Sequence, residues 1–292
     1  QVAMNALSKT SSVWYSELCE DLWPGQCMSI EVDQVLETEK SEFQNIEVIQ
    51  TKTYGKMLCL DGIIQLTERD EFSYQEMLAF VPLFSHPNPK RVCIIGGGDG
   101  AVLHRLCMHP GLEEIYLCEL DIRVIELSKK HFPLFKSAFE DPRVTIITSD
   151  GAKFLAEKKN YFDVVITDSS DPIGPADSLF SEDYYTIVHS ALTENGVSGS
   201  QGESMWLHQD LIVKLVQSAK RHFNFVEYGS ISIPTYPCGQ IGVLVCSKGE
   251  SCKKPKANIN ELFSKDNQEQ MKYYTPDIHS ACFVLPKFIA QK

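Results

Sequence analysis

Four short apolar segments alternate with helical stretches in the middle of the chain, and each ends in a glycine turn or an acidic residue. Short β-branched runs of this kind are typical of strands buried on both faces, and their alternation with helices predicts a parallel sheet. Ligands of such sheets bind at the carboxyl ends of the strands, so these acids are expected at one site. The segments are 91–95 before Gly96, 115–118 before Glu119, 144–147 before Asp150 and 162–167 before Asp168.

The glycine turn after the first strand narrows the class of ligand. Residues 96–100 read Gly-Gly-Gly-Asp-Gly between the strand and a helix over 101–108, the start of a βαβ unit that binds a dinucleotide or a nucleoside. Gly96 and Gly98 allow the backbone to approach a ligand closely. The spacing G-x-G-x-G favours an S-adenosylmethionine-type fold over an NAD-binding one. We therefore predict an α/β class with a Rossmann-like, S-adenosylmethionine-type catalytic domain over 71–292.

The acids at the next strand ends suit an adenosyl ligand. Glu119 follows Asp99 by 20 positions, the spacing at which a carboxylate meets ribose hydroxyls. Asp150 can accept a hydrogen bond from an adenine amino group, and Gly151 leaves room for the ring. Asp168 on its own fits a turn cap equally well. Acids in register on successive strand ends favour the adenosyl-ligand interpretation over structural roles.

The N-terminal part has a different periodicity. Residues 23–69 contain runs that alternate apolar and polar, separated by the turn pairs Tyr54-Gly55 and Asp61-Gly62. We predict a small antiparallel β-hairpin domain over 1–70, with about the first 12 residues disordered, that packs on the rest of the chain or on a second subunit. A helical pattern follows from residue 71. Its Tyr74 and Gln75 would line a cleft between the two domains, although such residues more often lie on the surface.

Composition excludes several classes of function. The net charge of −12 opposes binding to nucleic acid, and no apolar run is long enough to span a membrane. The ten cysteines contain no C-x-x-C pair, so neither a metal site nor a disulfide framework is predicted. Reduced thiols acting as small core residues indicate the cytoplasm. The first residues, 1–12, lack the apolar stretch of a signal peptide.

Near the C-terminal end, the pattern predicts a helix from residue 202 to about residue 222. An antiparallel hairpin follows, built from 231–233 and 241–246, and Pro234 and Pro237 flank Tyr236 between its strands. The two prolines would hold that ring rigidly.

As a set, the motifs resemble the spermidine synthase family of aminopropyltransferases over nearly the whole chain beyond Trp23. The resemblance implies transfer of an aminopropyl group from decarboxylated S-adenosylmethionine to putrescine, giving spermidine and methylthioadenosine. It also implies no metal, no prosthetic group, and a homodimer or homotetramer built through the N-terminal β domain. The motifs are Tyr74-Gln75-Glu76, Gly96-Gly97-Gly98-Asp99-Gly100, Cys118-Glu119-Leu120-Asp121, Asp150-Gly151, Thr167-Asp168-Ser169-Ser170-Asp171-Pro172, Gly202-Glu203 and Pro234-Thr235-Tyr236-Pro237.

The resemblance also implies a role for each matching position. Asp168 would take the proton from the attacking amine. Around the co-substrate, Glu119 would bind the ribose and Asp150 the adenine, with Gln44 and Asp99 beside the aminopropyl tail. The putrescine channel would be lined by Tyr74, Gln75, Asp171, Glu203, Tyr236 and Gln65. Residues 169–180 would form a lid over the diamine. One departure is Val197-Ser198-Gly199-Ser200, where a more apolar strand is expected before Glu203.

Three alternatives stay open at this point. A putrescine N-methyltransferase would share the fold and use S-adenosylmethionine, whose carboxylate Asp99 would repel. A spermine synthase would differ only in the length of its amine channel. A polyamine or nucleoside sensor would need no proton acceptor such as Asp168.

Overall fold

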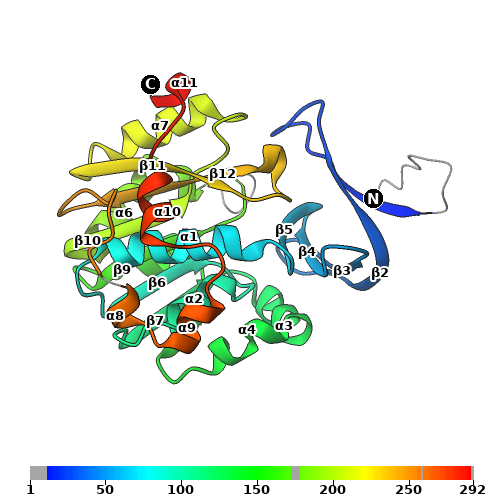
Figure 1. Ribbon diagram of the computed structural model, residues 1–292, viewed down its shortest axis with the longest axis horizontal. Coiled ribbons are helices and arrows are strands. Elements are labelled where there is room, and N and C mark those ends of the chain that lie inside the picture. Colours follow the sequence, from blue (N-terminus) through cyan, green and yellow to red (C-terminus); the bar gives the residue numbers. More distant parts are fainter. Residues whose placement is uncertain (1–11, 172–177, 258, 291–292) are drawn as a thin grey trace.

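The computed structural model describes residues 12–171, 178–257 and 259–290, which form two β-sheets and the helices that pack on them (Figure 1). The segment 1–11, most of the predicted disordered start, lies outside the described residues. So do 172–177, the middle of the predicted lid.

The N-terminal sheet is an antiparallel meander, as predicted. The pair Asp61-Gly62 joins its last two strands with both residues at positive φ (47° and 87°), the geometry of a type I′ hairpin turn. The first strand of this sheet was not predicted, because it lies before residues 23–69, where the alternating sequence pattern was found. The strands pair in chain order: β1 (Val13–Glu17), β2 (Met28–Lys40), β3 (Asn45–Thr51), β4 (Lys56–Leu60) and β5 (Ile63–Thr67).

The larger sheet contains the four predicted parallel strands: β6 (Arg91–Gly96), β7 (Glu114–Glu119), β8 (Val144–Thr148) and β9 (Phe162–Asp168). Beyond β9 lie β10 (Leu192–Gln201), parallel to it, and the antiparallel pair β11 (Phe225–Ser232) and β12 (Gln240–Ser247). The order across the sheet is β11-β12-β10-β9-β6-β7-β8. The predicted hairpin is therefore confirmed, with β11 at the edge.

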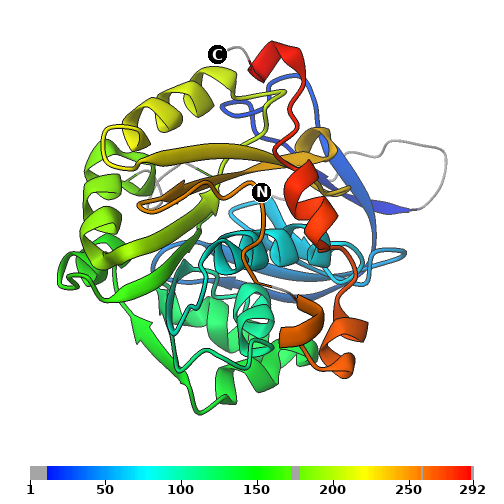
Figure 2. The ribbon, with the colours of Figure 1, turned by 60° about the vertical axis from the view of Figure 1, so that its left-hand side comes forward.

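Helices cover both faces of this sheet (Figure 2). Side chains of β6 alternate between the faces: Val92 and Ile94 pack into one core, Cys93 and Ile95 into the other. The first face carries α1 (Glu71–Ser85), α2 (Ala101–Cys107), α3 (Ile122–His131), α4 (Pro133–Lys136), the 3-10 turn Ser137–Glu140, α8 (Ile259–Leu262), α9 (Lys265–Gln270) and α10 (Pro276–Ala281). The second carries α5 (Gly151–Ala156), α6 (Glu182–Ala191), α7 (Gln209–Ala219) and α11 (Lys287–Ala290).

Helix α1 is the central helix of the first face, and all of its residues except Phe72 are buried. Its Pro82 lies directly against Gly199 of β10: a Cβ added at Gly199 would meet Pro82 Cγ at 2.7 Å. Ser198 and Gly199, the departure noted in the sequence, therefore belong to a strand. The absence of a side chain at Gly199 lets α1 lie close to the sheet.

The prediction of a helix beginning at residue 202 is wrong. Helix α7 begins at Gln209, because Glu203 takes a positive φ of 61° that no α-helix can contain. The Glu203 amide donates to Gln201 Oε1 (3.1 Å), and the Ser204 hydroxyl contacts Gln240 Oε1 (2.9 Å). These side-chain contacts hold residues 202–208 as a loop.

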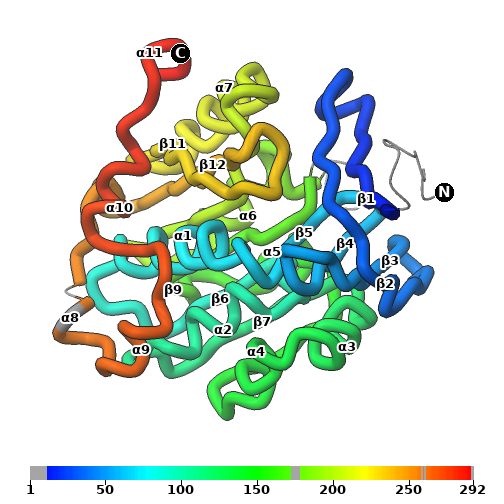
Figure 3. Tube along the Cα trace, turned by 45° about the vertical axis from the view of Figure 1, so that its right-hand side comes forward, coloured from blue at the N-terminus to red at the C-terminus, as the bar shows by residue number. Residues whose placement is uncertain are grey.

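The hairpin of β1 and β2 extends from the N-terminal sheet toward β12 and α7 (Figure 3). The carbonyl of Leu22, between the two strands, lies 2.9 Å from His208 Nε2. Gln26 Oε1 lies 3.5 Å from the thiol of Cys238. The two parts of the chain are thus in direct contact at this end. Among the described residues, no helix is both long enough and apolar enough to cross a membrane.

We expect Gly199→Ala to destabilise the fold by about 1–3 kcal/mol, because the new methyl group would overlap the rigid ring of Pro82. The free energy of unfolding in urea measures this. Gly249→Ala is the matched control, since its closest neighbour is the Asn195 side chain, which can move. Equal stability of the two variants would contradict the packing described here.

Candidate active site

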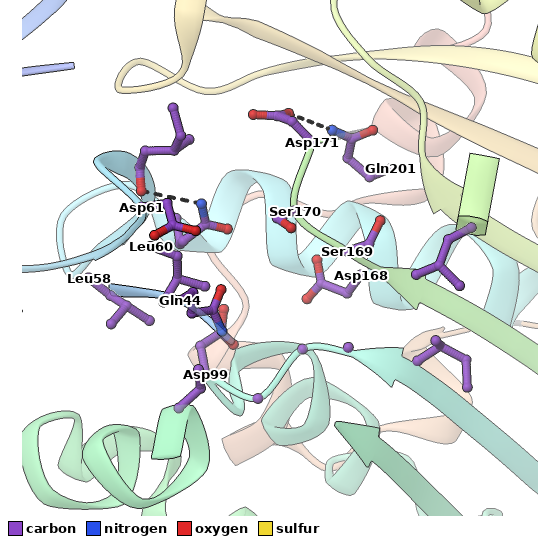
Figure 4. A pocket seen from close by; sticks show the side chains of 18 of the residues that line it. Gln44, Leu58, Leu60, Asp61, Asp99, Asp168, Ser169, Ser170, Asp171 and Gln201 are labelled. Carbon is purple, nitrogen blue, oxygen red and sulfur yellow. Dashed lines mark hydrogen bonds between the residues drawn. The ribbon is translucent and has the colours of Figure 1, made fainter. Parts of the chain in front are cut away.

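A cleft of about 210 Å³ lies at the carboxyl ends of the parallel strands, where the N-terminal sheet meets the larger sheet (Figure 4). Every residue predicted for the site lines this cleft. In the N-terminal sheet they lie in the β2–β3 turn and in β5. The others lie in α1, at or after the carboxyl ends of β6, β7, β8 and β9, after β10, and before β12. The fourteen residues are Gln44, Gln65, Tyr74, Gln75, Gly96, Gly98, Asp99, Glu119, Asp150, Gly151, Asp168, Asp171, Glu203 and Tyr236.

One end of the cleft contains the carboxylate of Glu119, the last residue of β7. This carboxylate accepts hydrogen bonds from the backbone amides of Gly98 (3.1 Å) and Asp121 (2.9 Å). Burial nevertheless raises the pKa of Glu119 to about 7. A side chain at Gly98 would collide with this carboxylate, because its Cβ would lie 2.8 Å from Glu119 Oε2. Asp150 caps the start of α5 by accepting from the Lys153 amide (3.0 Å).

The N-terminal sheet reaches this end through Gln44. Its side-chain amide donates to Asp121 Oδ2 (3.0 Å), and the Ser41 hydroxyl donates to the same oxygen (2.6 Å). Asp121 thus orients a side chain of the other sheet over the cleft. Asp121 belongs to the Cys-Glu-Leu-Asp motif noted in the sequence, but the spacing of the motif did not predict this contact with Gln44.

The middle of the cleft is formed by Asp168 and two tyrosines. The Tyr74 hydroxyl donates to Asp168 Oδ1 (2.9 Å), whereas the buried Oδ2 has no hydrogen-bond partner among the described residues. Burial, with a further contribution from Asp99, raises the pKa of Asp168 well above its usual range. The ring of Tyr236 packs on Tyr74 with centroids 5.5 Å apart, and its hydroxyl donates to the Gln65 carbonyl (2.6 Å). The tyrosine pair therefore holds one carboxylate oxygen and leaves the other available.

Asp99 lies between the middle and the first end of the cleft, facing Asp168 and Gln44 in Figure 4. It accepts from the Ala101 amide (2.7 Å) and, at a longer distance, from Gln75 Nε2 (3.4 Å). Burial raises its pKa. Gln75 thus supports Asp99 from α1, one residue beyond Tyr74.

The opposite end of the cleft carries Asp171 and Glu203, joined by one amide. Gln201 Nε2 donates to Asp171 Oδ1 (3.2 Å; Figure 4). It also donates to Glu203 Oε1 (3.1 Å). Burial and the neighbouring Glu203 raise the pKa of Asp171 to about 7. His208 Nδ1 lies 2.8 Å from Glu203 Oε2, in ion-pair contact. Burial opposes the charged form of His208, but Glu203 outweighs it, so the pKa of His208 is raised.

Besides Asp121, sequence reasoning assigned no site role to three charged residues that line the cleft: Asp61, His208 and Glu17. Glu17 ends β1 and is fully buried; its Oε1 accepts from the Ile64 amide (2.7 Å), and its Oε2 has no partner among the described residues. Burial raises the pKa of Glu17 to about 8. The alternation of β1, which puts Glu17 on the same face as the buried Tyr15, could have indicated an inward-facing acid.

The arrangement suits a ligand with cationic groups. Acids line both ends, and the free oxygen of Asp168 between them can accept a proton. Across the ranges that the structure describes, no group of three or more His, Cys, Asp or Glu side chains is arranged to hold a metal ion.

Comparisons with known proteins agree on one family. The model of the spermidine synthase tetramerisation domain matches residues 13–68, and that of the spermine/spermidine synthase domain matches 71–258. The chain is 49% identical to spermidine synthase of Dictyostelium discoideum, covering 98% of this chain and 99% of that protein. It is 46% identical to spermidine synthase of Schizosaccharomyces pombe, covering 94% and 92%.

Solved structures show the same similarity. A crystal structure of spermidine synthase in complex with the transition-state analogue AdoDATO superimposes with a TM-score of 0.87 at 33% identity, covering 98% of this chain and 97% of that one. Spermidine synthase from Thermotoga maritima superimposes with a TM-score of 0.86 at 33% identity, covering 98% and 96%.

The raised pKa of Asp171, about 7, predicts how stability depends on pH. An aspartate in the unfolded chain has a pKa of about 3.9, so the folded protein binds more protons at this position than the unfolded chain does between about pH 4 and 7. Its stability therefore falls as pH rises through that window. We expect the free energy of unfolding of Asp171→Asn to fall less between about pH 5 and pH 8 than that of the unmodified protein, as measured by urea titration.

The exposed Asp266 provides the control for this experiment. Asp266→Asn should follow the pH dependence of the unmodified protein. An equal or larger fall for Asp171→Asn would show that Asp171 is not the group that titrates.

Proposed function

The chain belongs to the spermine/spermidine synthase family of aminopropyltransferases and forms spermidine, and from this premise we propose how its cleft carries out the reaction. The donor is decarboxylated S-adenosylmethionine and the acceptor is putrescine. The observation that carries the proposal is the state of Asp168: one oxygen is held by Tyr74, and the other is free in the middle of a cleft with acids at both ends.

The donor occupies the end formed by the glycine turn. Glu119 accepts from the ribose hydroxyls, Asp150 binds the adenine amino group, and Gly96, Gly98 and Gly151 let the nucleoside lie against the backbone. Glu119 accepts from the backbone amides of Gly98 and Asp121, and a carboxylate offers about four acceptor sites, so sites remain for the hydroxyls.

The aminopropyl tail lies between Asp99 and Gln44. Its amine is cationic and is attracted to Asp99, whereas S-adenosylmethionine carries a carboxylate there that Asp99 repels. The support of Asp99 by the Ala101 amide, together with Gln75, argues for this role.

The acceptor amine must be neutral to attack. A primary amine has a pKa near that of lysine, about 10.4, so freeing its lone pair at pH 7 costs roughly 4–5 kcal/mol. Asp168 compensates by accepting a hydrogen bond from the amine and then its proton, with Tyr74 holding the carboxylate in place. As the C–N bond forms, the C–S bond breaks, and the sulfonium takes the electron pair and leaves as methylthioadenosine.

The second amine of putrescine remains charged and binds at the end formed by Asp171 and Glu203. Charge-assisted hydrogen bonds to carboxylates are the stronger kind, so this end anchors the diamine while the near amine reacts. The rings of Tyr74 and Tyr236 and the side chain of Gln65 line the channel between the two amines.

The wider organisation is part of the proposal. A sulfonium already carries its own activation, so the transfer uses no metal and no prosthetic group. We propose a division into an N-terminal β domain (1–70) and a catalytic domain (71–292), and a cytoplasmic location. The match of 13–68 to a tetramerisation domain supports a homodimer or homotetramer built through the N-terminal sheet.

A product assay tests the function directly. Putrescine is offered with decarboxylated S-adenosylmethionine in one tube and with S-adenosylmethionine in another. We expect spermidine and methylthioadenosine from the first tube alone. N-methylputrescine from the second would replace the proposed reaction with methyl transfer, and spermine formed from added spermidine would change the acceptor.

Replacing the proton acceptor tests the chemical step. We expect Asp168→Asn to lower kcat by about 100-fold to 10,000-fold, because the amide cannot take the proton, while methylthioadenosine still binds. Asp266→Asn, on an exposed position of α9, should leave both unchanged. Near-normal turnover by Asp168→Asn would contradict the role proposed for this residue.

A further inference from the structure

His208 connects the end of the cleft that contains Asp171 and Glu203 with the N-terminal part of the chain. Its Nδ1 lies 2.8 Å from Glu203 Oε2, and its Nε2 lies 2.9 Å from the carbonyl oxygen of Leu22, in the segment that joins β1 to β2. The side chains of His208 and Glu203 are 12% and 2% exposed. The histidine is therefore almost enclosed between two oxygen atoms.

These two neighbours determine the protonation state of the ring. The Leu22 carbonyl can only accept a hydrogen bond, so Nε2 carries a hydrogen. Nδ1 lies at ion-pair distance from Glu203 Oε2, without the alignment of a hydrogen bond, and the negative charge of an ionised carboxylate at 2.8 Å favours a hydrogen on Nδ1 as well. Both conditions hold together only for the imidazolium form.

The surroundings of Glu203 show what this charge does. Gln201 Nε2 donates to Glu203 Oε1, and His208 contacts Oε2, so both carboxylate oxygens are oriented by neighbours. The backbone of Glu203, at φ 61°, is held by the Gln201 side chain and by the Tyr228 hydroxyl, which donates to its carbonyl (2.7 Å). The carboxylate can therefore keep one orientation toward the cleft.

The charge balance at this end also depends on His208. Without its imidazolium, Asp171 and Glu203 would face each other across one amide as two like charges, which disfavours ionisation of both. With it, one positive charge faces two carboxyl groups, so the three side chains carry at most one net negative charge, which matches one ammonium group.

We propose that His208, as an imidazolium, is a positioning residue that orients Glu203 and sets the net charge of the site for the far amine of the diamine. This inference rests on the proposed function, since it assigns His208 to the acceptor end of that reaction. It also makes acceptor binding depend on the β1–β2 segment, through the Leu22 carbonyl.

The groups that face His208 from its surroundings are Glu203 in its own loop, Asp171 in the segment that follows β9, and the Leu22 carbonyl from the β1–β2 segment. Asp171 in turn contributes to the raised pKa of Glu17, from β1. Glu203 raises the pKa of His208 above its usual value despite the opposing effect of burial, so the imidazolium persists to higher pH than that of a free histidine and is lost as pH rises through that pKa. Acceptor binding should then weaken at high pH.

Two amide variants separate the contacts of the ring. His208→Asn places an amide nitrogen near the position of Nδ1, and His208→Gln places one near Nε2, and neither carries a charge. We expect both to raise the KM for putrescine on the order of tenfold, the effect of losing a charged hydrogen-bonding partner, with kcat changed less than about threefold. Methylthioadenosine affinity should stay constant, because the nucleoside end is not touched.

The pH profile distinguishes this role from a purely structural one. The rise in KM of the unmodified enzyme at high pH should contain a component that both variants lack; putrescine titrates identically in all three, so the difference isolates His208. Nitrogen NMR of histidine-labelled enzyme should show a ring that stays doubly protonated above pH 7. His222→Gln is the control, since His222 contacts the exposed Glu182 at 4.0 Å outside the cleft.

Several results would overturn the inference. These are an unchanged KM for putrescine in the folded variants, equal losses of putrescine and nucleoside affinity, an identical pH profile, or a neutral His208 ring at pH 7. The NMR measurement needs no variant, so poor folding of both variants would not prevent the test. Failure of the proposed function would be visible separately, as absence of spermidine from the unmodified enzyme.

Discussion

The arrangement of the cleft depends on keeping several carboxylates together in a region with little water. Each loses hydration and repels its neighbours, so a carboxylate there persists only if donors hold it in place. The donors are backbone amides for Glu119 and Asp99, a tyrosine hydroxyl for Asp168, and one glutamine amide shared by Asp171 and Glu203. Burial nevertheless raises the pKa values of Glu119, Asp99, Asp168 and Asp171, so positive charge brought into the cleft would stabilise their ionised forms. A substrate with an amine at each end supplies that charge.

The donors come from parts of the chain that are far apart in sequence. The parallel strands bring Glu119 and Asp168 to one edge of the sheet, and the close contact of Pro82 with Gly199 lets α1 present Tyr74 and Gln75 beside them. The N-terminal sheet contributes the Gln44 side chain, the Gln65 carbonyl that holds Tyr236, and the Leu22 carbonyl at His208. The cleft is therefore built jointly by the two sheets. A small change in how they pack would alter both the nucleoside end and the amine end.

Much of this organisation was predictable. Buried β-branched runs and their glycine turns predicted four parallel strands, and Asp61-Gly62 predicted a tight hairpin, because backbone sterics act locally. Acids directly after such strands were predicted to face one ligand, and all of the predicted residues line one cleft. The prediction of a helix from residue 202 was wrong, because side chains of Gln201 and Gln240 hold the loop around Glu203, and a periodicity argument does not include contacts of that kind.

By itself, the sequence determined the order of the four parallel strands and the helices between them, the glycine turn, and the family to which the motifs belong. Each of these depends on the chemistry of neighbouring residues. The tertiary structure alone decided which groups meet: Glu17 facing Asp171 from the first strand, the free oxygen of Asp168, and His208 between Glu203 and Leu22. These contacts join residues up to 186 positions apart, and the charge of His208 depends on both of its neighbours. No local pattern encodes such a pairing, because it follows from the packing of two sheets against each other.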